Sequence, residues 1–513
     1  KNLSLHDAVT IEDDLTSYSY VASGIILTMT NGLGHVTSYA GYDANGRPGS
    51  MTDPNGVVTQ FTYDPLGRLT NMVVKHPTSG SLDATTSMIY DEVGNITQMT
   101  LPGVAPLSMT YDGANRLTLM QGANGERFEY VYDTMGNVTE ETIKGTDGST
   151  ALQIQNEFDE LGRLMRERFG TRSSAQLSYD RVSNLTSVTD PNGHTTSASF
   201  DALDRVVSTV APDGGSQSSQ FDVRDNPVAF TDPISVTTQF VRNGFGEVIQ
   251  ETSPDRGTST YQYDAAGRMI QSTDGRGQVV DYTFDVLDRV TRIEPAGRPA
   301  SEVIEYQWDT GGLAGSFGVG RLARVIDGSG TTVMGYDHRG NRTGKEQSIG
   351  STSAALLAYE YDVADRITQI TYPSGRLVRY GYDAQGRVNS VETKDSASAP
   401  TWQAVASNHQ YQPFGPVKSM ALANGLTVAN DWDTDGRLSA RRLTNTQSGT
   451  DLSSLAYRRD EVGRIAAIAD FVDPTRSALY GYDEVGRLTL AVSDGVSTSA
   501  ETYSYTPGTN QLA

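Results

Sequence analysis

The chain has 513 residues, a net charge of −22, 52 glycines and no cysteine. The lack of cysteine excludes disulfides, thiolate nucleophiles and cysteine-bound zinc, and the acidic excess argues against nucleic acid or an anionic membrane as partner, because phosphates are bound by clustered Lys and Arg. Abundant Gly, Tyr, Thr, Ser and Asp favour short strands and turns, and no apolar run approaches the roughly 18 residues of a membrane-spanning helix.

The first residues carry no clear copy of the pattern that fills the rest of the chain. We interpret residues 1–19 as a partial N-terminal segment or a decayed repeat, with a faint first copy at Tyr20. Because the sequence opens on Lys1 rather than Met, we expect it to be a piece of a longer protein. The lack of a signal peptide is then uninformative.

An aromatic residue followed by Asp, two variable residues, Gly and Arg recurs from there to the end. Many neighbouring copies begin 21 residues apart, as at Tyr42 and Tyr63 or at Tyr361 and Tyr382. About twenty copies therefore form one tandem array over residues 20–513. Three well-preserved copies supply the motif residues Tyr63, Asp64, Gly67, Arg68, Tyr263, Asp264, Gly267, Arg268, Tyr482, Asp483, Gly486 and Arg487.

Each repeat predicts two strands and two tight turns. Aromatic residues alternate ahead of the motif, as at Phe61 and Tyr63, which is the period of a strand with one aromatic face. Asp-x-x-Gly suits a type I turn followed by a residue in the left-handed conformation. An apolar strand follows the Arg, as at Leu69, and a second turn such as DPNG at 53–56 closes the unit.

The fourth position of the motif tests this interpretation. Where Gly is replaced there, Asp or Asn stands in its place, with Ser183 as an exception. Asp and Asn tolerate positive φ better than other side chains. We therefore expect backbone geometry rather than chemistry to select this position. The substitutes are Asn115, Ser183, Asp204, Asp225, Asp288 and Asp365.

About twenty such units predict an all-β fold of about forty short antiparallel strands, or on the order of 200 Å of continuous ribbon. Strands twist, so the ribbon must coil; by length it would make about one wide loop at roughly 30 Å radius, a partial wall. We expect the aromatic side chains to pack on one another across neighbouring strands. Polar or Gly-rich insertions, such as those from Lys75, Lys144, Lys345, Lys394 and Asn445, are expected to be surface loops.

The recurring YDxxGRL phrase, with TDPNGVVTQFTYD leading into it at 52–64, resembles the YD-repeat or Rhs family. Its relatives include shell components of bacterial insecticidal toxin complexes and animal teneurins. The resemblance implies a β-sheet that spirals into a hollow shell or barrel around a toxic C-terminal polypeptide. Toxin-releasing members carry an Asp-based self-cleavage region after the repeats; this sequence shows no such segment, so we expect the C-terminal continuation and cargo to lie outside it.

One short stretch suggests a metal site. DWDTDG carries Asp431, Asp433 and Asp435 at the spacing of a calcium loop. However, the twelfth position is Arg442 rather than Glu, and Asp433 and Gly436 are also the turn residues of the repeat. Calcium is therefore a weak candidate against a plain repeat turn, and we expect no cofactor.

No catalytic constellation stands out. The six histidines show no metal-ligand spacing, and no Gly-x-Ser-x-Gly elbow occurs. We expect the repeated Asp and Arg to stabilise turns and to pair with neighbouring strands. A catalytic site, in contrast, normally occurs once in a sequence. An enzyme would have to lie in an insertion such as 308–322 or 394–411.

The sequence thus predicts a non-enzymatic structural shell of a secreted or injected bacterial toxin, extracellular in location. The expected partner is an enclosed toxin or effector polypeptide, with other parts of the same longer protein. The alternative is an adhesion or carbohydrate-binding module at the cell surface, whose partner would be a glycan. Neither nucleic acid nor a membrane span is expected.

Overall fold

The computed structural model describes residues 15–172, 174–493, 499–506 and 512. They form one 43-stranded sheet in which the strands pair antiparallel with their chain neighbours. The only helices in this described part are three short 3-10 turns, η1 (Gly80–Leu82), η2 (Ala300–Glu302) and η3 (Pro474–Arg476). None of the helices described is long and apolar enough to cross a membrane. The all-β prediction of about forty short antiparallel strands is confirmed.

The strands fall into a first coil, a joining segment and a second coil. The first coil comprises β1 (Ser17–Tyr20), β2 (Ile26–Thr30), β3 (Val36–Ala40), β4 (Ser50–Thr52), β5 (Val58–Tyr63), β6 (Leu69–Val74), β7 (Ala84–Tyr90), β8 (Ile96–Thr100), β9 (Leu107–Tyr111), β10 (Leu117–Gly122), β11 (Arg127–Tyr132), β12 (Val138–Lys144), β13 (Thr150–Phe158), β14 (Leu164–Phe169), β15 (Ala175–Tyr179), β16 (Leu185–Thr189), β17 (Thr195–Phe200), β18 (Val206–Val210) and β19 (Ser216–Phe221). The joining segment comprises β20 (Pro227–Thr231), β21 (Thr237–Arg242), β22 (Val248–Ser253), β23 (Gly257–Tyr263), β24 (Met269–Thr273), β25 (Val279–Phe284) and β26 (Val290–Pro295). The second coil comprises β27 (Ile304–Trp308), β28 (Leu322–Asp327), β29 (Gly330–Tyr336), β30 (Arg342–Ile349), β31 (Ala355–Tyr361), β32 (Ile367–Thr371), β33 (Leu377–Tyr382), β34 (Val388–Lys394), β35 (Gln403–Tyr411), β36 (Val417–Leu422), β37 (Leu426–Trp432), β38 (Leu438–Asn445), β39 (Asp451–Arg459), β40 (Ile465–Asp470), β41 (Ala478–Tyr482), β42 (Leu488–Ser493) and β43 (Ser499–Thr502).

The division of the chain at residue 20 stays a prediction. Residues 1–14 lie outside the described part, and β1 already pairs with β2, so the sheet includes residues on both sides of the expected boundary.

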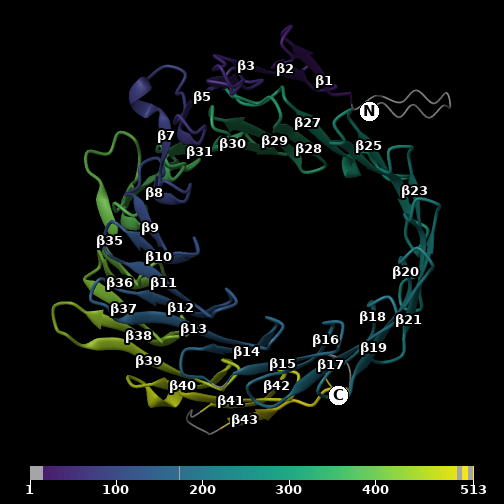
Figure 1. Ribbon diagram of the computed structural model, residues 1–513, viewed down its shortest axis with the longest axis vertical. Coiled ribbons are helices and arrows are strands. Elements are labelled where there is room, and N and C mark those ends of the chain that lie inside the picture. The colour runs from purple at the N-terminus through teal and green to yellow at the C-terminus, as the bar shows by residue number, and fades with distance from the viewer. Residues whose placement is uncertain (1–14, 173, 494–498, 507–511, 513) are drawn as a thin grey trace.

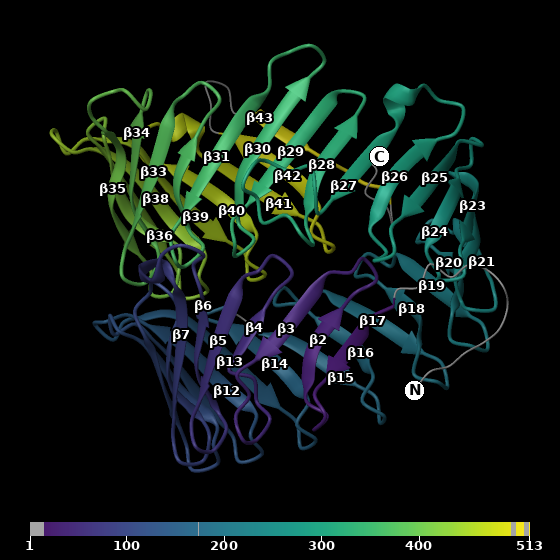
Figure 2. The same cartoon turned by 90° about the horizontal axis from the view of Figure 1, so that it is seen from above.

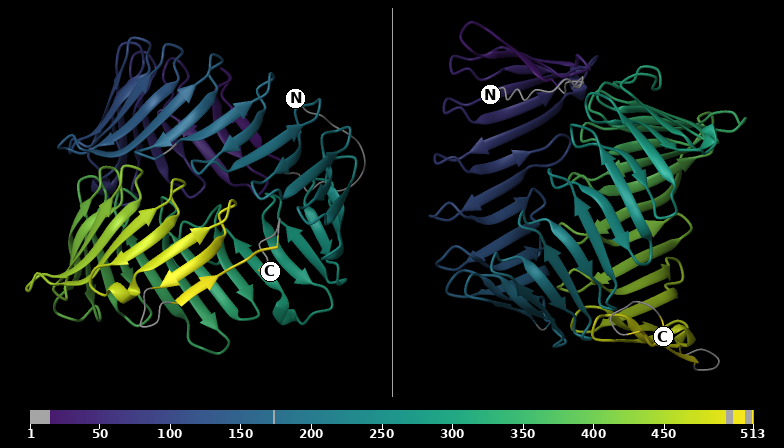
Figure 3. Two further views of the ribbon diagram at one scale, coloured as in Figure 1. Left: turned by 90° about the horizontal axis from the view of Figure 1, so that it is seen from below. Right: turned by 90° about the vertical axis from the view of Figure 1, so that its right-hand side faces the viewer.

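The ribbon curves around an open centre and passes over its own beginning (Figure 1). Seen from above, the first coil and the second coil form two tiers, with the joining segment climbing between them at one side (Figure 2). Figure 3 shows the same two tiers from below and from the side. The ribbon thus spirals, as expected of a twisted strip.

The prediction of about one wide loop is wrong, because the ribbon bends more tightly than the estimate assumed. Hydrogen bonds join residues 261, 264 and 274 positions apart in the two coils, so one coil closes within about half of the chain. Most motif hairpins also shift register next to their turn, as between Thr62 and Tyr63. Such bulges bend a strand and increase its twist.

The sheet is a single layer with little filling on either side. Its accessible surface is 29120 Å², and the chain has a mass of 55.3 kDa. A compact monomer of that mass exposes about 18,000 Å². Among the described residues, no large side chain is less than 2% exposed. A filled barrel would bury its inward side chains, so these values describe a hollow coil.

Two kinds of turn alternate along the ribbon and lie on its opposite edges. Motif turns open with the aromatic–Asp pair, as at Asp64–Arg68 between β5 and β6. Linking turns join one hairpin to the next, as at Asp53–Val57 between β4 and β5. Antiparallel strands place alternate connections at opposite strand ends, so each coil has one edge of motif turns and one edge of linking turns.

Candidate functional site

Most motif turns are held by their Asp and closed by an Arg, or by an Asn in copies such as Asp180–Asn184. In the copy at Asp64, the Gly67 N–H donates to the Asp64 carbonyl (2.9 Å), the Asp64 N–H donates to the Arg68 carbonyl (2.9 Å), and the Arg68 N–H donates to Asp64 Oδ1 (2.9 Å). Arg68 Nε then donates to Asp64 Oδ2 (2.7 Å). The copies at Asp264–Arg268 and Asp483–Arg487 repeat this ion pair, each at 2.6 Å.

The fourth motif position has the left-handed backbone that the sequence predicts. Gly67, Gly267 and Gly486 have φ of 91°, 81° and 91°. The six non-Gly substitutes also have positive φ, including Ser183 at 76°. The turn prediction is confirmed at these positions.

Side-chain contacts also determine which residue occupies the fourth position. The expectation that backbone geometry alone selects that residue is therefore corrected. An Asp there accepts a hydrogen bond from the motif side chain 20 residues earlier: Arg205 Nη1 donates to Asp225 Oδ1 (2.7 Å), and Asn184 donates to Asp204 Oδ1 (2.9 Å). Where Gly stands instead, it leaves room for that side chain, since a Cβ on Gly67 would overlap the Arg47 guanidinium. With either Asp or Gly at the fourth position, the turn accommodates the motif side chain of the preceding repeat.

The motif aromatic is the other partner of that arginine. The Arg116 guanidinium lies over the Tyr132 ring (4.6 Å to the ring centroid), and Arg163 lies over Tyr179 in the same way (4.8 Å). The phenol then donates to a backbone carbonyl of the preceding hairpin, as Tyr132 Oη does to Leu117 O (2.7 Å). The same arginine–ring contact recurs at Tyr63, Tyr90, Phe221, Phe284, Trp308, Tyr336, Tyr382, Tyr411, Tyr482 and Tyr505.

The expected aromatic ladder is therefore wrong. Ring–ring contacts are few among the described residues, and the recurring neighbour of a motif ring is a guanidinium. Strand alternation predicts which face a ring occupies, but neighbouring motif rings are two strands apart. Two strands span about 9.6 Å, which leaves space for the intervening arginine. The rings are thus covered rather than presented to a sugar, and a glycan partner finds no support.

These contacts lower the pKa of the turn carboxylates. The Arg116 side chain, then the Arg116 backbone N–H, lowers the pKa of Asp112. The Arg205 side chain does the same for the pKa of Asp201. The carboxylates are thus stabilised in their charged form by the turns that they close.

The second coil sits with its motif turns against the linking turns of the first coil. We call this line of contact the seam. Ala105 N–H donates to Ala384 O (2.7 Å), Gln153 N–H donates to Thr434 O (3.0 Å), and Asn55 exchanges two hydrogen bonds with Val319 (2.9 and 3.0 Å). Further contacts across it are His35–Asp309, His76–His338, Gly103–Arg366, Glu126–Arg387, Asn192–Asp460 and Asp213–Arg487.

Glu126 makes a deeply placed polar contact of the seam. It is 8% exposed and accepts from Arg387 Nη1 at both carboxylate oxygens (3.0 and 3.2 Å). Its Oε2 also accepts from the Phe414 N–H (3.0 Å), while the Phe414 and Phe128 rings lie 4.6 Å apart. One first-coil carboxylate thus holds two successive motif turns of the second coil.

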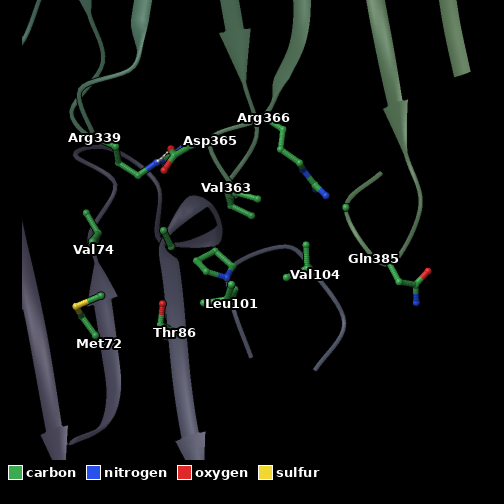
Figure 4. A pocket seen from close by; sticks show the side chains of 14 residues that line it. Met72, Val74, Thr86, Leu101, Val104, Arg339, Val363, Asp365, Arg366 and Gln385 are labelled. Atoms are coloured by element: carbon green, nitrogen blue, oxygen red, sulfur yellow. Dashed lines mark hydrogen bonds and ion pairs between the residues drawn. The ribbon is translucent and has the colours of Figure 1, made fainter. Parts of the chain in front are cut away.

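The seam is not filled along its whole length. A pocket of about 390 Å³ lies beside Arg366, with Met72, Val74 and Leu101 on its first-coil side. Figure 4 shows Val363 of the second coil directed toward these apolar side chains, while Asp365 turns toward Arg339. Arg339, two residues after the motif Asp337, bonds Asp365 there (2.5 Å), and Asp365 also accepts from the motif side chain Asn341 (2.6 Å).

The candidate calcium residues have separate partners. Asp433 accepts from the backbone N–H groups of Asp435 and Arg437, as in any motif turn, and Asp431 pairs with Arg442 on the neighbouring strand (3.5 Å). Asp435 crosses the seam to Arg172 (2.5 Å). No group of three or more potential metal ligands converges among the described residues.

The two insertions considered as possible sites of catalysis are parts of the repeat architecture. Residues 309–321 form an enlarged motif turn in which Gly320 N–H donates to Asp309 Oδ1 (2.6 Å) and Val319 joins the seam. The second insertion begins as the loop after β34 and continues into β35, whose His409 ring bonds the Asn389 carbonyl (2.8 Å).

Comparisons with known proteins agree with this geometry. The profile of the teneurin YD-shell matches residues 107–316, and that of the RHS repeat matches residues 42–75 and 358–398. The chain belongs to the YD-repeat, or Rhs, family. A comparison with curated protein sequences gives no match.

Solved structures with the same fold are toxin-complex proteins. The crystal structure of TcdB2-TccC3-TEV is 13% identical with a TM-score of 0.75, and the match covers 95% of this chain and 34% of that one. The Photorhabdus luminescens Tc holotoxin pore is also 13% identical with a TM-score of 0.75, covering 95% and 33%. TcdB2-TccC3 is 14% identical with a TM-score of 0.68, covering 94% and 31%. This YD-repeat chain thus spans about a third of the matched chains.

Gly67→Ala should destabilise the protein more than Gly56→Ala. Both glycines have positive φ, at 91° and 79°, so both changes carry the left-handed strain of about 1–2 kcal/mol. Only the Cβ at residue 67 would displace Arg47 from the Tyr63 ring, which adds about 1 kcal/mol. Urea denaturation midpoints measure the difference; equal midpoints would contradict the role given to the fourth position.

Acid should weaken the turns. Because the folded-state pKa of Asp112 is lowered, its stabilisation is present above the unfolded pKa and is lost as pH falls through the folded pKa. We expect Asp112→Asn to lower the unfolding midpoint at pH 7 and the gap from wild type to shrink toward pH 3. Thermal scans across this range measure it, and a gap independent of pH would refute the assignment.

Glu126→Ala should loosen the seam. It removes the acceptor of Arg387 Nη1 and of the Phe414 N–H, while Arg387 Nε keeps Asp383 as its partner, and the loss should cost about 2 kcal/mol. Hydrogen exchange should rise in the turns at 122–126 and 412–416. The control is Arg166→Ala at the exposed Arg166–Glu157 pair, expected to cost less than about 1 kcal/mol. Similar effects of the two changes would show that the seam does not depend on Glu126.

Proposed function

We propose that this chain forms part of the wall of a hollow shell that encloses an effector polypeptide. The observation that carries the proposal is the excess of exposed surface, 29120 Å² where a compact monomer of this mass exposes about 18,000 Å². A single-layer coil exposes a second, inner face, and a polypeptide is the kind of molecule large enough to occupy the space within it. The likeness to the toxin-complex structures supports the same role.

We further propose that the segment is not an enzyme and acts outside the cell that makes it. The titratable groups recur in equivalent turns with equivalent partners, which suits a scaffold rather than a single reaction centre. The toxin-complex fold and the teneurin YD-shell profile are consistent with an extracellular place.

The experiment uses the longest natural polypeptide that contains this sequence. Cryo-electron microscopy should show a particle with a lumen, and limited proteolysis should leave a segment outside residues 1–513 protected. Glu126→Ala, by loosening the seam, should make that segment sensitive, whereas Arg166→Ala should not. A particle without a cavity, or a segment cleaved equally in all variants, would overturn the proposal.

A further inference from the structure

Arginines from both coils gather at the seam beside the linking turn that follows β14. Arg172 belongs to that turn, and its Nε pairs with Asp435 Oδ2 of the second coil (2.5 Å). The Arg172 side chain is 15% exposed and the Asp435 side chain 6%. The second oxygen of Asp435, Oδ1, is buried without a hydrogen-bond partner among the described residues. This carboxylate is therefore committed to Arg172.

Arg437 does not make the ion pair that its motif position predicts. In the turn at Asp64–Arg68 the arginine Nε donates to the motif Asp. Arg437 reaches Asp433 through its backbone N–H (2.8 Å), and its Nη1 donates to the Val462 carbonyl instead (3.2 Å). The Arg437 guanidinium is thus turned away from its own Asp.

The same guanidinium lies among other cations. A Cβ on Gly463 would overlap Arg437 Nη1 and would lie 2.6 Å from Arg172 Nη1, so the two side chains approach one point from different coils. Arg459 donates to the Gly463 carbonyl (3.1 Å). Burial, followed by the charges of Arg172 and Arg459, lowers the pKa of Arg437. Like charges repel at this range, and an anion between them would remove the repulsion.

A pocket of about 230 Å³ opens beside these side chains. Its lining includes Arg172, Asp435, Arg437 and Val462. Pockets for drug-sized ligands measure roughly 300–1,000 Å³, so this one suits a small ion or a single chemical group. Glu167 also lines it, and its carboxylate would oppose a second anion.

The geometry of the donors favours a tetrahedral oxyanion. A guanidinium offers a planar fork of N–H donors that matches phosphate oxygens. A carboxylate has two oxygens in one plane, whereas a phosphate has oxygens in four directions and can accept from two guanidinium groups that approach from different sides.

We propose that Arg172 of the first coil and Arg437 of the second coil bind one phosphate-type oxyanion between them. The ion would join the two coils at the seam, because each coil supplies one of its ligands. The site lies in the seam between turns, so the inference does not depend on what the lumen holds.

The first test is equilibrium dialysis of radiolabelled inorganic phosphate against the longest natural polypeptide that contains this sequence. We expect saturable binding that sodium chloride of equal ionic strength does not displace. Unlabelled phenyl phosphate distinguishes the sources of the group: competition shows that the site accepts a phosphate ester, and lack of competition shows that it takes the free ion. No saturable binding, or equal displacement by chloride, would overturn the proposal.

Variants assign the binding to this cluster. Arg437→Gln should weaken phosphate binding by about tenfold or more, since it removes a charged donor. Arg437→Lys keeps the charge without the fork and should weaken it less. The control is Arg442→Gln, at a side chain that is 51% exposed and pairs with Asp431, and it should bind phosphate as the wild type does. Unchanged binding by Arg437→Gln would overturn the assignment.

Hydrogen exchange gives a measurement that needs no variant. A ligand that binds only the folded seam stabilises it, so phosphate should slow exchange at 170–172 and 461–464 and leave the distant turn at 64–68 unchanged. Exchange that slows equally everywhere, or nowhere, would contradict a phosphate site between these two turns.

Discussion

The structure depends on the arginine that most motif turns carry, because it links one turn to the next. Its Nε closes the turn on its own Asp, its guanidinium covers the aromatic ring of the following repeat, and one Nη reaches the following turn. Arg268 shows the full set, with Asp264 at 2.6 Å, the Phe284 ring at 5.4 Å and Asp288 at 3.0 Å. Each contact is worth about 1 kcal/mol or less, so the strength of the ribbon lies in repetition.

The arginine link between neighbouring turns explains why a single-layer sheet is stable without a filled core. A sheet normally buries one face against another layer, and here neither face is covered by a second sheet. The arginine and the ring supply packing along the turn edge instead, and the hydroxyl of the half-buried tyrosine adds a hydrogen bond to the previous hairpin. Stability is then a sum over neighbouring repeats, and curvature accumulates from the bulges in most motif hairpins.

The seam converts the curved ribbon into a wall. Its contacts join the motif turns of the second coil, which share one sequence pattern, to linking turns of the first coil, whose sequences vary. Glu126 and Asp213 each bond a motif arginine of the second coil, whereas Asn55 bonds the backbone of Val319. The seam is specific because the repeat spacing is the same in both coils, so one contact in register brings the following turns into register as well.

The sequence by itself determined the strands, the turns and the family, because these depend on local preferences. Asp at the first position and Gly at the fourth fix a turn within five residues, and alternation fixes the strand on either side. Local pattern could not reveal that Arg205 and Asp225, 20 residues apart, are partners. It also could not give the number of coils, because a small error in curvature per repeat accumulates over the whole ribbon. Only the tertiary structure decided that Glu126 meets Arg387 and that Leu161 remains exposed, since both follow from which turns the second coil covers.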